Sequence, residues 1–247
     1  MRLPLLILVF GAASVASAQP PGKFPPDSLV NTKVFPHSTP VIEVIGTMRN
    51  FTSALGVRCQ FCHVGREGQS LAEFDFASDQ KRNKLVARQM MRMLAEINTR
   101  LDTIPERGKP PVTATCNTCH RGVNRPVPLS ALIQDAAVTV NADSAIRAYK
   151  ALRAKYFGRD AYDFSEPSLS VAAFRTAGAG KPDEALTLLR YNEELFPNSS
   201  AMSVFKGNIE LIKGDTAAAE AAFREALRRD STNAEARGRL RAIGRKP

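Results

Sequence analysis

The sequence is organised by two short stretches, Cys59-Gln60-Phe61-Cys62-His63 and Cys116-Asn117-Thr118-Cys119-His120. Together they hold all four cysteines of the chain, and in each a histidine directly follows a C-x-x-C pair. Two cysteines one helical turn apart reach the two vinyl groups of a haem and become thioethers, and the adjacent histidine then lies under the iron. The sequence therefore predicts two covalently bound haem c groups. The attachment residues are Cys59, Cys62, Cys116 and Cys119, and the axial ligands of the iron are His63 and His120.

Cysteine pairs of this kind have three other interpretations. Four cysteines in an exported protein can form two disulfides, a C-x-x-C can be a redox dithiol, and two pairs with histidines can hold zinc. None of these chemistries requires a histidine directly after each pair. The position of the histidines therefore favours haem attachment.

The ligand on the other side of each iron decides whether a haem carries electrons or reacts with oxygen species. The first motif is preceded by a predicted helix that starts at Thr39-Pro40, ends at Gly56 and carries Met48 on its apolar face. The second is preceded by a predicted helix from a cap at Asp79 to about Leu101. Its apolar stripe consists of Val86, Met90, Met93, Ile97 and Leu101. Methionine on such a face is also an ordinary core residue, and His37 is a further candidate, so spacing alone leaves the sixth ligands open.

Further pieces of sequence surround the two motifs. They are Met48-Arg49-Asn50-Phe51-Thr52 with Leu55-Gly56-Val57, Val86-Ala87-Arg88-Gln89-Met90 with Met93, Ile97 and Asn98, and Cys119-His120-Arg121-Gly122. With these pieces the stretch 41–122 resembles the cytochrome c subunit of photosynthetic reaction centres. In that family each haem packs along a helix that donates a methionine to the iron. The resemblance implies Met48 as the sixth ligand of the first haem and Met90 of the second, with Met93 as the fallback.

The chain departs from that family in three respects. The family member built into reaction centres carries four haems, whereas this chain has two motifs. Many members are lipoproteins, and no cysteine follows the expected cleavage site here. The C-terminal half has no counterpart in that subunit.

The N-terminus has the features of a secretory signal at 1–18. Arg2 gives the positive start, Leu3 to Val9 the apolar stretch, and Ala16-Ser17-Ala18 an A-x-A cleavage site. We expect an exported, periplasmic protein in which a Pro-rich lead-in, 19–38, precedes the haem domain.

The second half of the chain contains an internal period of 34 residues. Gly180 pairs with Gly214, Ala185 with Ala219, Leu189 with Phe223, and Pro197-Asn198 with Ser231-Thr232. This period is typical of tetratricopeptide repeats, which the stretch 183–243 resembles. A first helix of this half is predicted from a cap at Asn141 or Asp143 to near Gly158.

The expected fold is mostly α. A dihaem cytochrome c domain of helix–loop–CxxCH units at 39–126 is followed by a linker at 127–140 and a tetratricopeptide-like helical domain at 141–247. Hydrophobic residues at 44% and charged residues at 23% exclude a mainly disordered chain and a polytopic membrane protein.

We expect an electron-transfer protein rather than an enzyme, one that passes single electrons between redox protein partners. Those partners include a membrane-bound reaction centre or a respiratory complex, and the helical repeats offer a surface for protein docking. The net charge of +10 favours encounter with acidic redox partners, while export argues against nucleic acid. Three arginines are candidate partners for the haem propionates: Arg88, Arg121 and Arg125.

Two alternatives stay open. A dihaem peroxidase needs one five-coordinate iron that peroxide can reach, and a haem-bearing scaffold or sensor would act through its repeats. Carbon monoxide binding by the reduced protein would favour either of these alternatives, whereas the absence of binding would favour an electron carrier.

Overall fold

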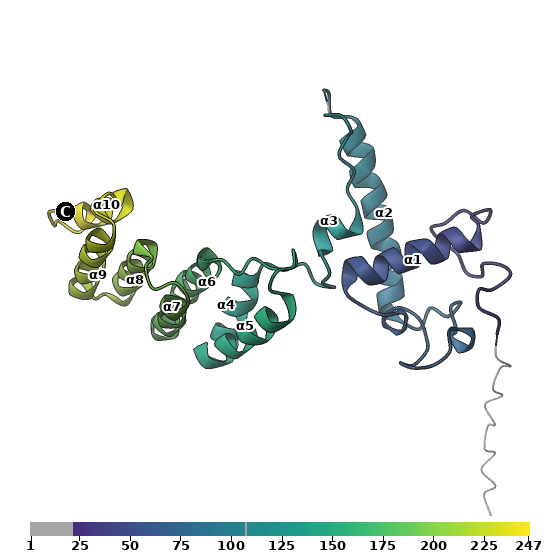
Figure 1. Ribbon diagram of the computed structural model, residues 1–247, viewed down its shortest axis with the longest axis horizontal. Coiled ribbons are helices and arrows are strands. Elements are labelled where there is room, and N and C mark those ends of the chain that lie inside the picture. Colours follow the sequence, from purple (N-terminus) through teal and green to yellow (C-terminus); the bar gives the residue numbers. More distant parts are fainter. Residues whose placement is uncertain (1–21, 107) are drawn as a thin grey trace, which may run out of the picture. The chain divides into compact units, whose positions relative to one another are not determined.

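The computed structural model describes residues 22–106 and 108–247, so the predicted secretion signal at 1–18 lies outside the described residues. The chain divides into two compact units, the first ending at Thr115 and the second running from Cys116 to Pro247. Within the described ranges all regular structure is helical, apart from an isolated bridge between Val64 and Asp75 (Figure 1). This confirms the mostly α fold class.

The first unit contains α1 (Val41–Leu55), the 3-10 turns η1 (Cys59–Phe61) and η2 (Leu71–Glu73), and the long helix α2 (Arg82–Asp102). Helix α1 begins directly after Pro40 and ends at Gly56, as predicted. Gly56 adopts a left-handed conformation, with φ of 63°, and its backbone N–H caps the carbonyls of Thr52 and Ser53. A residue without a Cβ takes this conformation readily, which is why the helix stops there.

Helix α2 begins later than predicted. Its N-cap is Lys81, which makes no side-chain capping bond, and Asp79 lies outside the helix. The predicted cap at Asp79 is therefore wrong, because its carboxylate pairs with Lys84 and Arg88 instead of the first helical N–H groups.

The first unit buries few apolar side chains. Among its described residues only Val44 and Ala54 are buried hydrophobics, and α2 has no buried residue at all. Four large apolar side chains on the first half of α2 are instead 39% to 45% exposed: Leu85, Val86, Met90 and Met93. An exposed apolar stripe of this size is characteristic of a surface that binds a ligand or a partner.

The second unit starts with the short helix α3 (Cys116–His120) and continues with seven longer helices. These are α4 (Leu129–Thr139), α5 (Ala142–Tyr156), α6 (Glu166–Gly178), α7 (Pro182–Leu195), α8 (Ser200–Lys213), α9 (Thr216–Arg229) and α10 (Ala234–Ala242). They pack as successive pairs, α4 with α5, α6 with α7 and α8 with α9, and each pair contacts the next (Figure 1). This arrangement is what stacked helical repeats produce.

The period of 34 residues is visible in the helix ends. Gly180 and Gly214 are both left-handed and follow α6 and α8. The residue after each glycine makes an equivalent hydrogen bond to the preceding helix. The N–H of Lys181 donates to the carbonyl of Thr176, and the N–H of Asp215 donates to that of Glu210. The caps repeat as well, since Ser199 accepts from the N–H of Met202 and Asn233 from that of Ala236.

The stretch 127–140, predicted as a linker, contains α4. Its residues Leu129, Ile133 and Ala137 are at most 2% exposed and belong to the main core, together with side chains from α5, α6 and α7. The helix starts behind Pro128 and its apolar residues follow at a spacing of four, a signal that was present in the sequence.

No helix within 22–106 or 108–247 is both long and apolar enough to cross a membrane.

Candidate haem sites

The first C-x-x-C-H motif forms a tight turn. Cys59 begins the 3-10 turn η1, and its carbonyl accepts hydrogen bonds from the N–H groups of Cys62 at 3.2 Å and His63 at 2.9 Å. The two cysteines are thus one turn apart and the histidine follows immediately, as thioether attachment to one macrocycle requires. Both cysteines are free thiols, as are Cys116 and Cys119.

A cavity of about 520 Å³ opens beside this turn, a volume in the usual range for cofactor sites. Thr52 and Gly56 at the end of α1 form one side, Cys59 lies at the motif, and Phe74 comes from the following loop. Met48 lies four residues before Thr52, hence on the same face of α1 and one turn further from the motif.

Loop packing around Gly65 positions Phe74. A Cβ at Gly65 would lie 2.5 Å from the Phe74 ring, far inside van der Waals contact. Phe74 stacks on Phe76 with ring centroids 5.6 Å apart, and Phe76 meets the His63 ring edge-on at 4.9 Å. The absence of a side chain at Gly65 therefore allows the aromatic contacts that reach from the cavity wall to the histidine.

His63 is held as a neutral imidazole. Burial, followed by the positive charges of Lys84 and Arg88, lowers its pKa to about 4. Its Nδ1 atom is buried without a hydrogen-bond partner. A neutral ring with a nitrogen lone pair is the form in which histidine binds a metal.

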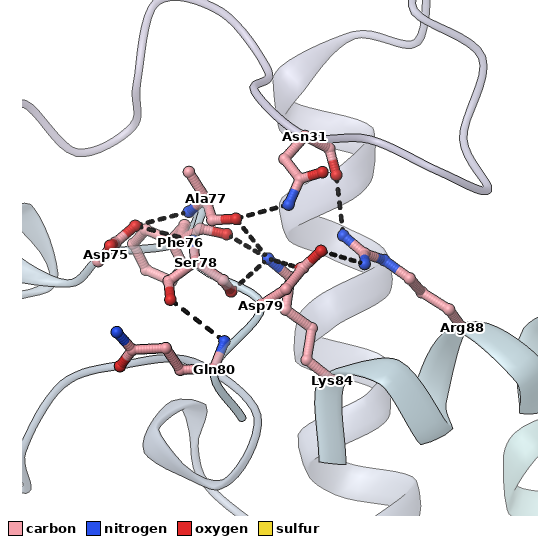
Figure 2. A network of polar contacts seen from close by, with 9 residues as sticks. All are labelled: Asn31, Asp75, Phe76, Ala77, Ser78, Asp79, Gln80, Lys84 and Arg88. Atoms are coloured by element: carbon pink, nitrogen blue, oxygen red, sulfur yellow. Dashed lines mark hydrogen bonds and ion pairs between the residues drawn. The ribbon is translucent and has the colours of Figure 1, made fainter. Parts of the chain in front are cut away.

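The loop that carries Phe76 is fastened to α2 by a polar network (Figure 2). Lys84 donates from Nζ to the carbonyls of Phe76 at 2.8 Å, Ala77 at 3.1 Å and Ser78 at 2.8 Å, and its ion pair with Asp79 spans 3.2 Å. The Lys84 side chain is only 11% exposed. Few rotamers are open to a lysine held in this way, so the loop has a fixed place on α2.

Arg88 completes the network. Its Nη1 donates to Asp79 and its Nη2 to the carbonyl of Asn31, both at 2.9 Å. Arg88 first, then Asn31 and Lys84, hold the pKa of the Asp79 carboxyl far below its usual range. Arg88, a candidate propionate partner from the sequence, is thus engaged by protein groups at both terminal nitrogens.

The second motif is the helical turn α3, which ends in two left-handed residues, Arg121 with φ of 49° and Gly122 with φ of 87°. This reversal brings the carbonyl of Val123 to 2.9 Å from Nδ1 of His120. A carbonyl oxygen can only accept, so Nδ1 carries a proton, and the lone pair of the neutral ring is then on Nε2. Metal-binding histidines are oriented in this way. The sequence analysis did not identify Val123, because nothing in its residue type indicates the role of its carbonyl.

Asn98 connects α2 to the chain just ahead of the second motif. Its Nδ2 donates to the carbonyl of Ala114 at 3.0 Å, and its Oδ1 accepts from the N–H of Ala114 at 2.8 Å. Ala114 lies two residues before Cys116 in the sequence. Asn98 was among the residues that carry the family resemblance, but its role became visible only in the structure.

The candidate methionines all lie in the first unit. Met48 is half-buried on α1, and Met90 and Met93 project from α2 with 39% and 45% of their surface exposed. The second motif belongs to the second unit. His37, the other candidate, has its Nδ1 3.2 Å from the hydroxyl of Thr32.

A comparison with protein families gives one match. Residues 68–157 match the family described as photosynthetic reaction centre cytochrome C subunit. The matched segment runs from the loop before η2 through α2, the second motif and α4 to the end of α5. The predicted resemblance is confirmed for this segment, whereas α1 and the first motif lie outside it. No curated protein and no solved structure matches the chain.

Proposed function

We propose that this chain, which carries a segment similar to the photosynthetic reaction centre cytochrome C subunit, is an exported dihaem c-type cytochrome that passes single electrons between redox proteins. The observation that carries the proposal is the second motif, which lies in the matched segment. There His120 follows Cys119 directly and is oriented by Val123 with Nε2 free to bind a metal.

The residues fit the proposed cofactor at both motifs. Each has two free thiols on one turn and an adjacent imidazole, and the first opens onto a cavity of suitable size. When bound, a haem iron changes its oxidation state by one and so supplies the one-electron chemistry. The cysteine sulfurs would hold the macrocycle, and His63 and His120 would each offer a nitrogen ligand to the iron.

The sixth ligands are proposed as methionine sulfurs. Met48 is assigned to the first haem because it lies on the face of α1 that reaches the cavity at Thr52. Met90 is assigned to the second, with Met93 as the fallback, and both are on the exposed apolar stripe of α2. A thioether ligand closes the iron to exogenous ligands and raises its potential, which suits a carrier.

Partners of the proposed carrier are redox proteins, including a membrane-bound reaction centre or a respiratory complex reached in the periplasm. The paired helices of the second unit would dock a protein partner, in the manner of tetratricopeptide repeats. The supporting observations are the secretion-signal sequence, the 34-residue period and the stacked helix pairs.

The experiment that tests this proposal counts the haems per chain and records their absorption spectra. The full chain is matured with haem, haem per chain is determined from the pyridine haemochrome, and visible and near-infrared spectra are recorded oxidised and reduced. We expect two haems per chain, both low-spin, with the methionine–iron charge-transfer band and no carbon monoxide binding. One high-spin haem that binds carbon monoxide would contradict the electron-carrier function and favour a peroxidase or a sensor. A chain without covalent haem would overturn the proposal altogether.

A further inference from the structure

Helix α5 and the residues after it carry a concentrated positive charge. Between 144 and 159 there are five cationic residues and no acidic one, and all five side chains are exposed. They are Arg147, Lys150, Arg153, Lys155 and Arg159. Together with Phe157, which is 61% exposed, these residues are called the α5 cationic face.

The charges of this face have no carboxylate partner among the described residues. Several arginines elsewhere in the second unit are paired, for example Arg224 with Glu220 at 2.9 Å and Arg229 with Glu225 at 2.8 Å. On the α5 cationic face Arg147 donates to the hydroxyl of Ser144 at 2.7 Å, and three of the five cations contact aromatic rings. Lys150 lies 5.1 Å from the centroid of Tyr191, Arg153 4.1 Å from Phe157, and Lys155 5.0 Å from Tyr156. Contacts with rings restrain the side chains and leave the positive charge uncompensated.

Aromatic contacts within the second unit lead from the face to a cavity lined by the residue that follows the second haem motif. Tyr156, the last residue of α5, meets Tyr162 edge-on with centroids 5.2 Å apart. Tyr162 in turn lines a cavity of about 290 Å³ that is also lined by Arg121, the residue next to His120. Two side-chain steps therefore lead from Lys155 to the wall of a cavity that Arg121 also lines.

A membrane surface is a poorer match for this face than a protein. Helices that lie in a bilayer interface present a broad apolar side to the lipid. The apolar side of α5 is occupied, since Ala142, Ala145 and Tyr149 are buried in the core formed with α4 and α7. No large apolar side chain within 142–156 is exposed, which leaves Phe157 at the edge.

We propose that the α5 cationic face is the docking surface for an acidic protein that exchanges electrons with the second haem. This inference rests on the proposed function. Uncompensated, restrained cations attract a carboxylate-rich surface over long range and fix its orientation, while Phe157 supplies a small apolar contact. Electron exchange would then take place at the second haem, on the side of the second unit that carries the α5 cationic face.

The test compares two haem-loaded full-length variants with equal charge. The first is K150Q/R153Q/K155Q/R159Q. The matched control is R175Q/K206Q/R241Q/K246Q, which removes four exposed cations on or after α6, α8 and α10 that have no ion pair among the described residues. The probes are fluorescently labelled poly-L-glutamate and vesicles of phosphatidylglycerol and phosphatidylcholine. Binding is measured by anisotropy and sedimentation at low and high salt.

We expect the first variant to bind poly-L-glutamate about 10-fold more weakly than the parent, and the control to change by no more than about 2-fold. Binding by the parent should weaken steeply with salt. Equal losses in both variants would show that only net charge matters and would overturn the proposal. Preferential loss of vesicle binding, with poly-L-glutamate binding unchanged, would assign the face to a membrane.

A second readout concerns the position of electron exchange. The reduced proteins are oxidised with hexacyanoferrate(III), an anion that takes one electron, and the rate is followed in the haem spectrum. The first variant should react several-fold more slowly than the control at low salt, with the difference vanishing at high salt. Equal oxidation rates of the first variant and the control would overturn the proposal that electrons leave the second haem near the α5 cationic face. Haem content is measured on the same samples, so failure of the proposed cytochrome function would be recognised separately from failure of docking.

Discussion

The imidazole of His120 donates from Nδ1 to the backbone carbonyl of Val123 over 2.9 Å. The acceptor comes from the main chain, so the side chain at 123 can change without removing it. The left-handed pair Arg121 and Gly122 creates the geometry, since two such residues in succession turn the chain back toward the histidine. A ligand that is fixed before the metal arrives loses little entropy on binding.

His120→Ala should remove one axial nitrogen without removing a haem, because Cys116 and Cys119 still attach it covalently. We expect two haems per chain by pyridine haemochrome, one of them high-spin in the visible spectrum. His37→Ala is the control and should leave both haems low-spin. A fully low-spin spectrum of the His120 variant would contradict the ligand assignment.

Met48→Ala should abolish the methionine–iron charge-transfer band of one haem and lower its reduction potential, because a thioether favours the reduced iron. Met90→Ala should do the same for the other haem, and near-infrared spectra with redox titrations would show it. Met91→Ala, half-buried and off the apolar stripe, is the control. Loss of the second band in Met93→Ala but not in Met90→Ala would move the assignment to Met93.

Gly65→Ala should disturb the first haem site, since the new Cβ would lie 2.5 Å from the Phe74 ring. We expect a loss of about 1–3 kcal/mol in the free energy of unfolding, measured with urea, and a changed spectrum of the first haem. Gly46→Ala on α1 meets nothing within 4 Å and should leave that spectrum unaltered. Equal behaviour of the two variants would refute the role of Gly65 in placing Phe74.

Gly207→Ala should loosen the contact between α8 and α9, because its Cβ would clash with the Phe223 ring. Phe223 is fully buried, so the ring has little room to move, and we expect a destabilisation of about 1–3 kcal/mol by thermal or urea unfolding. Gly238→Ala in α10 has free space around it and should stabilise by about 0.5–1 kcal/mol. A neutral Gly207 variant would indicate that the two helices pack less closely than described.

Asp79→Asn should lower the melting temperature at neutral pH. The pKa of Asp79 is lower in the folded chain than in the unfolded one, so its contribution to stability is complete above the unfolded value of about 4 and is lost as pH falls below it. The difference in melting temperature between parent and variant should be constant from about pH 5 to 8 and shrink under more acidic conditions. A difference that persists unchanged at pH 2 would show that the carboxylate charge is not responsible.

Sequence patterns were sufficient where the cause of a structure is local. The left-handed Gly56 ended α1, Asn141 capped α5 through the N–H of Ser144, and the 34-residue period reappeared in the caps at Ser199 and Asn233. The two C-x-x-C-H turns also follow from covalent spacing alone.

Side-chain ion pairs explain one part of what the sequence analysis missed, and an overlooked periodicity explains another. Asp79 has the residue type and position of a helix cap, yet Lys84 and Arg88 compete for its carboxylate. The residues of α4 were assigned to a linker, although Ile133 packs in the main core with α5 and α6. Residue type alone could not show that ion pairs draw the Asp79 carboxylate away from the helix end. Helix α4, in contrast, could have been identified from Pro128 and from the spacing of four between its apolar residues.

The repeating helix pairs also give this molecule a natural way to change length. The two helices within a pair join at equivalent left-handed glycines, Gly180 between α6 and α7 and Gly214 between α8 and α9, and the α8–α10 region has an apolar cluster of its own around Phe223 and Leu240. Duplication or deletion of a 34-residue unit would therefore preserve the junction chemistry and leave α3 to α5 intact. During evolution the C-terminal array can lengthen or shorten while the histidine at the second motif keeps its surroundings.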